Sequence, residues 1–89
     1  VSLNLSKNNI TDAGAKALAG SMSLGKLKKL NLNFNRIGDE GARAIAGSPN
    51  FINLESLKLG QNKIGTEGVQ ALNESKTLQN LIHPIFGFY

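Results

Sequence analysis

Few residues of this 89-residue chain could support catalysis or bind a metal ion. Its one His, His83, stands next to Pro84, and no second His or Cys lies at the spacing that a zinc site requires. The one adjacent pair of acids, Asp39-Glu40, falls at a predicted helix start, where the helix dipole stabilises negative charge without any catalytic role. No Gly-rich phosphate-binding loop occurs. We therefore predict no catalytic residue, no metal site and no cofactor, and a protein that is not an enzyme.

The chemistry that the chain does offer is recognition by a row of polar and basic residues. The predicted partner-binding residues are Lys7, Lys29, Asn31, Asn33, Phe34, Ser56, Lys58 and Gln61. No acidic residue occurs among them, so the row favours an acidic protein partner. Phe34 is an aromatic residue among polar ones, as in many binding hot spots; the alternative is that its ring packs on Lys7 and Gln61. For Lys29 and Lys58 the alternative is a solvated surface without a partner.

These residues must be positioned by an element that recurs along the chain with a period of 27 residues. The repeating columns are Leu3, Leu30 and Leu57; Leu5, Leu32 and Leu59; Asn8, Asn35 and Asn62; and Ile10, Ile37 and Ile64. An unbroken period of this size is typical of a solenoid built from stacked units. We expect a single domain over residues 1–89, with repeats at 1–26, 27–53 and 54–80 and a divergent fourth start or C-terminal cap at 81–89.

Each repeat is predicted to begin with a short strand and a turn. The alternation of Leu3 and Leu5 with polar neighbours suits a strand with one buried face. The Asn in the turn can bond to backbone groups of the adjoining coil. Stacked over three repeats, Asn8, Asn35 and Asn62 should form a structural ladder that satisfies buried turn backbone.

A helix is predicted to follow each turn. Asp12, Asp39 and Thr66 share a column, and each of these residue types is a good helix N-cap. The Gly and Ala columns that follow provide small side chains, so each helix can lie close to its neighbour. The predicted helix ends are near Gly20, Gly47 and Glu74, and the loops that follow should carry the core residues Leu24, Phe51 and Leu78.

Both ends of the chain depart from the repeat. The chain opens without Met, one position into the strand motif, so we expect it to be a segment of a longer array. An uncapped repeat end would favour self-association. At the other end Leu81 is in register, but Pro84 stands in the column of Leu30, and Pro cannot donate to a strand ladder. The last four positions hold three of the five aromatic residues, Phe86, Phe88 and Tyr89. This shift predicts a terminal cap; the alternative is a tail foreign to the array.

The composition limits the cellular compartment and the kinds of partner that we expect for the chain. No apolar run approaches the roughly 18 residues that a membrane span needs, and the opening residues lack the pattern of a signal peptide. The absence of Cys fits a reducing compartment, so we expect a cytoplasmic protein. The formal net charge of +4 is mild, which argues against nucleic acid as the main partner.

The helical halves of the first two repeats indicate which class of repeat the chain contains. They read Gly-Ala-Lys-Ala-Leu-Ala at 14–19 and Gly-Ala-Arg-Ala-Ile-Ala at 41–46. Together with the Leu and Asn columns, they resemble leucine-rich repeats of the ribonuclease-inhibitor-like class, including the variant found in bacterial effectors and NOD-like receptors. The resemblance implies an α/β solenoid, a partial horseshoe with parallel strands on its concave face and helices on its convex face. It also implies a protein–protein interaction scaffold that binds on the concave face, and the host cytoplasm as the location of a secreted effector.

Two other functions stay open at this point. The chain could be the repeat segment of a larger effector or enzyme, such as a ubiquitin ligase or a GTPase-activating protein that carries such repeats. It could also be a weak nucleic-acid-binding surface that uses Lys7, Lys29 and Lys58, with Phe34 for base stacking. Binding to nucleic acid would then fall steeply with salt.

Overall fold

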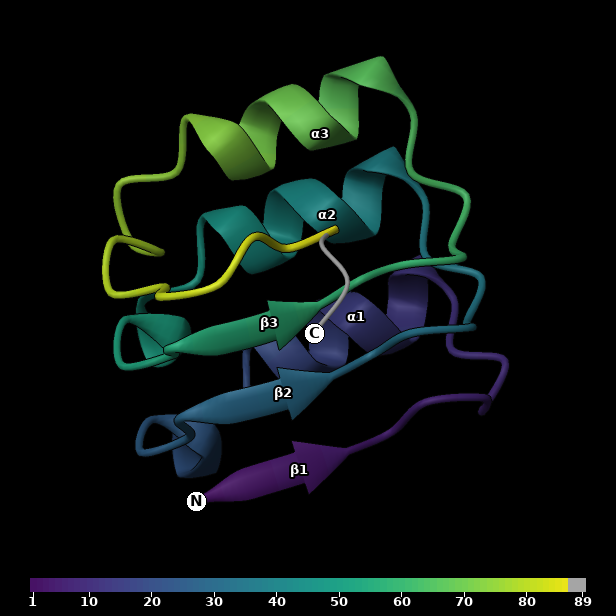
Figure 1. Ribbon diagram of the computed structural model, residues 1–89. Coiled ribbons are helices and arrows are strands. Elements are labelled where there is room, and N and C mark those ends of the chain that lie inside the picture. Colours follow the sequence, from purple (N-terminus) through teal and green to yellow (C-terminus); the bar gives the residue numbers. More distant parts are fainter. Residues whose placement is uncertain (87–89) are drawn as a thin grey trace.

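The computed structural model describes residues 1–86 and confirms the predicted α/β solenoid. The strands are β1 (Ser2–Asn4), β2 (Lys29–Asn31) and β3 (Ser56–Lys58), and the helices are α1 (Asp12–Ala19), α2 (Asp39–Ala46) and α3 (Thr66–Asn73). Two short 3-10 helices, Met22–Leu24 and Pro49–Phe51, lie in the loops after α1 and α2. Figure 1 shows the strands side by side and the helices stacked along one face of the sheet.

The sheet register reproduces the 27-residue period of the sequence. All three strands are parallel, in the order β1-β2-β3, and Leu30 stands opposite Leu3 on one side and Leu57 on the other. Residues that share a column in the sequence therefore lie side by side in space. Because successive side chains in a strand point to opposite faces, every second column faces the helices and the others face away.

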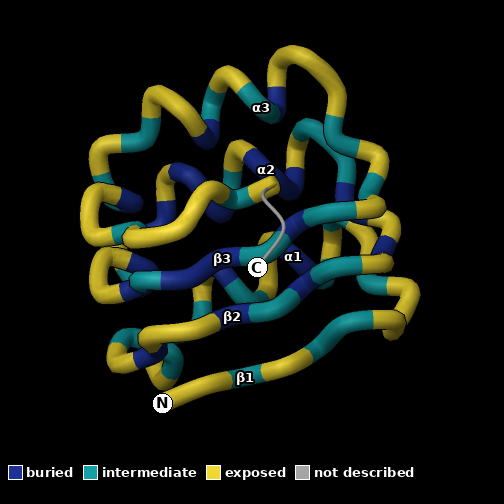
Figure 2. The backbone as a smooth tube through the Cα atoms, viewed as in Figure 1, coloured by how far each residue is buried: buried dark blue, intermediate teal, exposed yellow. Residues whose placement is uncertain are grey.

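The core lies between the sheet and the helices and is densest in the middle repeat. Leu30, Leu57 and Ile45 are at most 1% exposed, and Phe51 in the loop after α2 is fully buried. Figure 2 shows this buried layer running along β2, β3 and the inner side of α2. Burial of each such side chain contributes about 1.5–3 kcal/mol to stability. Strands of only three residues persist because they are fixed to this layer.

The turn after each strand is completed by an Asn from the following repeat. The side-chain oxygen of Asn35 accepts the backbone N–H groups of Asn8 and Ile10, both at 2.9 Å. Its amide group donates to the carbonyl oxygens of Leu5 and Leu32, both at 3.0 Å. One amide side chain thus serves backbone groups of two repeats, which would otherwise lack partners on burial.

The helices begin at Asp12, Asp39 and Thr66, so the predicted N-cap role of these residues is wrong. The N-caps are Thr11, Gly38 and Gly65. The carboxylate of Asp12 instead caps the next helix: its Oδ1 accepts the N–H groups of Gly38 at 2.7 Å and Gly41 at 2.9 Å. Parallel stacking places the first residue of one helix against the unsatisfied N–H groups that begin the next.

Asp39 repeats this contact one repeat further on. Its Oδ1 accepts the N–H groups of Gly65 at 2.7 Å and Gly68 at 3.0 Å. The close approach requires glycine, because a Cβ built at Gly68 would lie 2.6 Å from that same oxygen. The Cγ2 of Ile64 would lie equally close, at 2.6 Å, so the Gly column fits both the Asp of the preceding repeat and the Ile of its own repeat.

The opposite ends of the helices are also capped by the following repeat. The hydroxyl of Ser48 donates to the carbonyl oxygen of Ala19, and Asn50 Nδ2 donates to the same oxygen at 2.9 Å. Ser75 and Thr77 do the same for the carbonyl oxygen of Ala46. The helices end one residue before the predicted sites, which form their C-caps: Gly20, Gly47 and Glu74.

The C-terminal segment continues the sheet for a short distance. The N–H of Ile82 donates to the carbonyl oxygen of Glu55 at 2.8 Å, which carries the pairing to a fourth row. Leu81 and Ile85 pack against the core cluster. Phe88 and Tyr89, two of the three aromatic residues of the predicted cap, lie outside the described residues, so the cap stays a prediction.

We predict that Asp39→Ala lowers the free energy of unfolding by about 1–2 kcal/mol, because it leaves the N–H groups of Gly65 and Gly68 at the start of α3 without this acceptor. Glu40→Ala is the matched control, since it removes the same charge from the same helical turn. The Glu40 carboxylate pairs with Lys16 on the exposed surface, so its removal should lower the free energy of unfolding by about 0.5 kcal/mol or less. Urea unfolding followed by circular dichroism measures both, and equal losses would contradict the capping role.

Candidate functional site

The face of the sheet turned away from the helices carries the predicted recognition residues. We call it the strand face and define it as Ser2, Asn4, Ser6, Lys7, Lys29, Asn31, Asn33, Phe34, Ser56, Lys58, Gly60 and Gln61. The first two residues of each row belong to the strand, and the last two belong to the turn that follows. All eight predicted partner-binding residues lie on this face.

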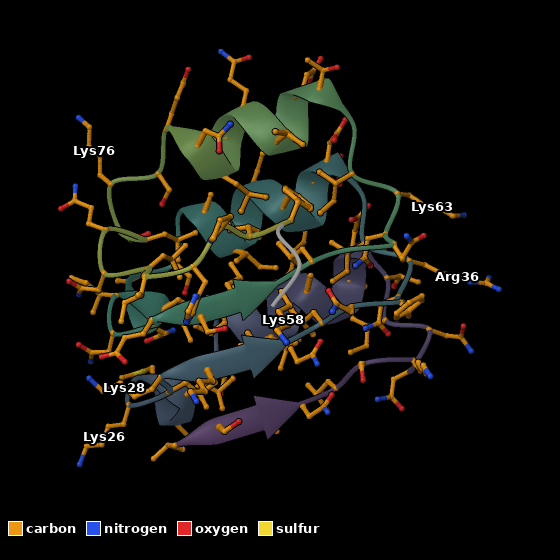
Figure 3. All side chains as sticks on the ribbon, in the orientation of Figure 1. Lys26, Lys28, Arg36, Lys58, Lys63 and Lys76 are labelled. Atoms are coloured by element: carbon orange, nitrogen blue, oxygen red, sulfur yellow. The ribbon has the colours of Figure 1, made fainter. Side chains whose placement is uncertain are left out.

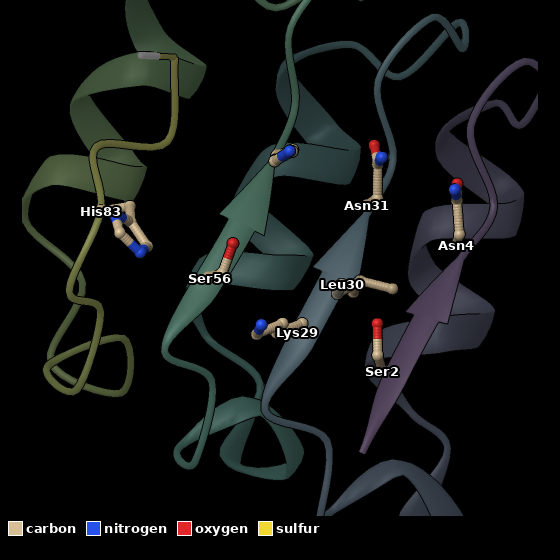
Figure 4. A pocket seen from close by; sticks show the side chains of 8 residues that line it. Ser2, Asn4, Lys29, Leu30, Asn31, Ser56 and His83 are labelled. Atoms are coloured by element: carbon tan, nitrogen blue, oxygen red, sulfur yellow. The ribbon is translucent and has the colours of Figure 1, made fainter. Parts of the chain in front are cut away.

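A hollow of about 220 Å³ opens on the strand face (Figure 4). It is lined by Ser2, Asn4, Lys29, Leu30, Asn31, Ser56, Lys58 and His83. The hollow brings together four of the predicted residues, Lys29, Asn31, Ser56 and Lys58. The other four, Lys7, Asn33, Phe34 and Gln61, are not part of its lining. The predicted row therefore divides into a basic hollow over the strands and a separate group at the turns.

Hydrogen bonds fix which atoms the Asn residues of the hollow present. Asn31 Oδ1 accepts the N–H of Asn33 at 3.0 Å, and Asn4 Oδ1 accepts both the N–H and the hydroxyl of Ser6, at 3.0 and 2.7 Å. A backbone N–H can only be matched by the amide oxygen, so the orientation of each amide is set. The groups that remain are NH₂ donors, and the hollow is therefore rich in donors.

Two of the predicted residues are less available to a partner than the sequence suggests. Ser56 is only 7% exposed at the bottom of the hollow. Asn33 Oδ1 accepts the N–H of Gly60 at 2.7 Å, so its acceptor already serves the scaffold. A partner can therefore approach Asn33 mainly through its amide NH₂ group.

His83 belongs to this site although the sequence reasoning left it out. The register of the fourth row places it in the column of Ser2, Lys29 and Ser56, on the strand face. Figure 4 shows its ring beside β3, facing the hollow. Adding 27 to Ser56 could have found it, but the sequence reasoning considered His83 only as a metal ligand or an incidental residue. The proline that follows had also marked the segment as irregular.

The turn residues Lys7, Phe34 and Gln61 share a left-handed backbone, with φ of 61°, 60° and 58°. Such a conformation is unfavourable for residues with a Cβ, and most of all for bulky ones. The Phe34 side chain is nevertheless 53% exposed, and the Lys7 ammonium lies 5.7 Å from the centre of its ring. The backbone of this turn therefore does not account for a Phe at this position.

The six Asp and Glu side chains of the chain have partners outside the hollow. The carboxylates of Glu40, Glu55 and Glu67 pair with Lys16, Lys28 and Arg43, Asp12 and Asp39 accept backbone N–H groups, and Glu74 accepts from Gln70. These are all six acidic residues of the chain. None of them lines the hollow within residues 1–86. Within residues 1–86 the hollow is thus lined by basic and polar side chains and Leu30, and by no Asp or Glu.

The described residues contain neither a cluster of metal-ligating side chains nor a membrane-spanning helix. Among residues 1–86 no group of three or more His, Cys, Asp or Glu side chains could hold a metal ion. Within the same range no helix has the length and apolar character to cross a membrane.

The class that this fold defines is the α/β solenoid of short stacked repeats. A sequence model described as Leucine Rich repeat matches residues 1–19, 26–46 and 52–72, and the chain belongs to the leucine-rich repeat family. Repeats of this family are generally protein-interaction modules and are typically not catalytic. No curated protein matches the chain in sequence.

We predict that Phe34→Gly leaves the free energy of unfolding within about 0.5 kcal/mol of the wild type or raises it. Gly relieves the roughly 1–2 kcal/mol that a left-handed backbone costs an L-residue, which offsets lost ring contacts and a more flexible unfolded chain. Phe34→Ala keeps that cost and should be less stable than Phe34→Gly.

Gln61→Gly, in the same column, controls for the backbone effect. Urea unfolding of the three variants gives the comparison. A loss of more than about 1.5 kcal/mol in Phe34→Gly alone would show that the ring packs for stability and not for binding.

Proposed function

We propose that this chain is a non-catalytic protein-interaction scaffold whose strand face, concave in the assembled array, binds an acidic protein partner. The observation that carries the proposal is the hollow lined by Lys29 and Lys58, and by no Asp or Glu within residues 1–86. Complementary charge steers association and selects against partners of the wrong sign.

In this proposal the two parts of the strand face bind different groups of the partner. The hollow binds acidic side chains, and the half-exposed ring of Phe34, beside Lys7, supplies an apolar anchor at the turns. An aromatic residue within a polar surround is a common arrangement of binding hot spots. Because the turns and helix ends are fixed by bonds between repeats, the face is preorganised and little ordering cost falls on binding.

We include in the proposal the class to which the chain belongs within the leucine-rich repeat family. The Gly-Ala-x-Ala-Leu/Ile-Ala segments at 14–19 and 41–46 support the ribonuclease-inhibitor-like class within the family. We further propose a cytoplasmic protein or secreted effector in which residues 1–89 form part of a longer array. A longer array would widen the strand face on either side of the hollow.

The test is affinity capture with three baits that fold equally well by circular dichroism. The first is the wild type, and the second is Lys29→Glu, Phe34→Ala, Lys58→Glu. The matched control is Lys26→Glu, Ile52→Ala, Lys63→Glu, which makes the same charge change and truncates one exposed apolar residue away from the strand face. Lys26 and Lys63 lie at opposite edges of the molecule (Figure 3).

We expect the strand-face bait to lose a protein that the wild type and the control both capture, and purified partner to bind it at least about tenfold more weakly. Equal capture by all three baits would contradict the proposal. Loss with both substituted baits would indicate that only net charge matters. Binding of single-stranded DNA that falls steeply between 50 and 200 mM salt would favour a nucleic-acid surface instead.

A further inference from the structure

The outer side of repeat 1 has no neighbour in the described part of the chain. β1 is the first strand of the sheet and α1 is the first helix of the stack, so within residues 1–86 no further repeat covers their outer side. The apolar side chains that are only half-buried there are Leu3, Leu5, Ile10 and Leu18. In the next repeat the same columns hold side chains that are at most 1% exposed: Leu30, Leu32, Ile37 and Ile45. We call the surface formed by the four half-buried residues of repeat 1 and the polar groups around them the open face (Figure 2).

The start of α1 lacks the acceptor that serves the next two helices. Asp12 accepts the N–H groups of Gly38 and Gly41, and the same contact recurs at the start of α3. In repeat 1 the columns of these two glycines hold Thr11 and Gly14. Within residues 1–86 no side chain accepts the N–H groups of Thr11 and Gly14. The open face therefore presents two backbone donors to the element that covers it.

The turn and the loop of repeat 1 show the same pattern. Asn8 belongs to the Asn ladder, but in the described chain its Oδ1 accepts no backbone N–H group. The hydroxyl of Ser48 donates to the carbonyl oxygen of Ala19 at the end of α1, whereas that of Ser21, in the same column, lies 3.0 Å from the hydroxyl of Ser23. Repeat 1 thus carries the bonding groups of an internal repeat, and not the polar outer side of a terminal cap.

We propose that the open face is a docking surface for one further leucine-rich repeat, which has an acidic residue in the column of Asp12 and Asp39. The interface between repeats 1 and 2 recurs between repeats 2 and 3, and the open face offers the same groups once more. The acidic side chain of the docked repeat accepts the N–H groups of Thr11 and Gly14, and Ser21 donates to the last carbonyl oxygen of its helix. The docked repeat belongs to the longer array proposed above, and the inference rests on the proposed function in this respect only.

A second copy of the 89-residue chain fits the open face less well. Repeat 3, at the other end of the copy, has Thr66 in the column of the two Asp residues, and a neutral hydroxyl is a weaker acceptor than a carboxylate. The outer side of repeat 3 is also partly occupied, because Ile82 bonds to Glu55 and because Leu81 and Ile85 pack against the core. Docking of a copy would require this segment to move.

The test is an extended chain in which a copy of residues 27–54 is fused directly in front of Val1. The period of 27 residues is kept, because Leu54 of the copy then stands in the column of Leu27, one position before Val1. We expect the amide hydrogens of Thr11 and Gly14 to exchange at least about tenfold more slowly than in the 89-residue chain, because they gain an acceptor and a cover. Native-state hydrogen exchange of the two chains gives the comparison.

Variants of the copy separate the acidic acceptor from the rest of the interface. Asp39→Ala in the copy should make the Thr11 and Gly14 amides exchange at least about fivefold faster than in the unsubstituted extended chain. Asp39→Asn in the copy keeps an acceptor oxygen and should retain most of the protection. Glu40→Ala in the copy is the matched control and should leave the exchange within about twofold. A copy with the same residues in shuffled order controls for chain length.

The inference is overturned if the unsubstituted copy leaves the two amides as they are in the 89-residue chain, whether the copy stays unstructured or docks elsewhere. Equal protection by the shuffled copy, or by the copy with Asp39→Ala, overturns it as well. So does a dimer of the 89-residue chain in sedimentation experiments in which the Thr11 and Gly14 amides are already protected, since a second copy would then cover the open face. None of these results changes capture by the strand face, so the binding proposal is tested separately.

Discussion

The structure depends on hydrogen bonds that cross from one repeat to the next and satisfy backbone groups between strand and helix. Asn35 completes the turn of the repeat before it, Asp12 caps the helix of the repeat after it, and Ser48 caps the end of the preceding helix. The backbone N–H groups of Asn8, Ile10 and Gly38 thus find their side-chain acceptors in a neighbouring repeat. A repeat is therefore not a unit that folds alone, and its coil is ordered only when a neighbour is in place.

This constraint separates the columns that build the scaffold from those left to carry function. The turn Asn is invariant across the repeats because its atoms are committed to backbone partners. The outward columns vary: one reads Ser2, Lys29, Ser56 and His83, another Asn4, Asn31 and Lys58, and the turn column Lys7, Phe34 and Gln61. Variation on a fixed backbone lets the chain place charge at the hollow and an aromatic ring at the turn without altering the fold. The proposed binding chemistry lies in these variable columns.

The period and the residue types were enough to predict the repeats, the strand face and the helix ends. They did not predict the helix caps, because a local pattern assigns Asp39 to its own helix, whereas its oxygen reaches Gly65 and Gly68 in the next repeat. Contacts of this kind become visible only when the repeats are stacked. The position of His83 on the strand face was not predicted either. The proline after it broke the pattern, although one bond from Ile82 keeps the segment in register.

Native-state hydrogen exchange of the 89-residue chain tests the central role of these bonds between repeats most directly. The informative amides are those of Asn8, Ile10 and Gly38, which lie outside regular strands and helices and donate to side chains of a neighbouring repeat. If those bonds order the coil, the three amides exchange as slowly as the strand and helix amides of the same repeats, and all open together. Exchange of the three within about tenfold of unstructured rates, with the strands and helices still protected, would contradict the account.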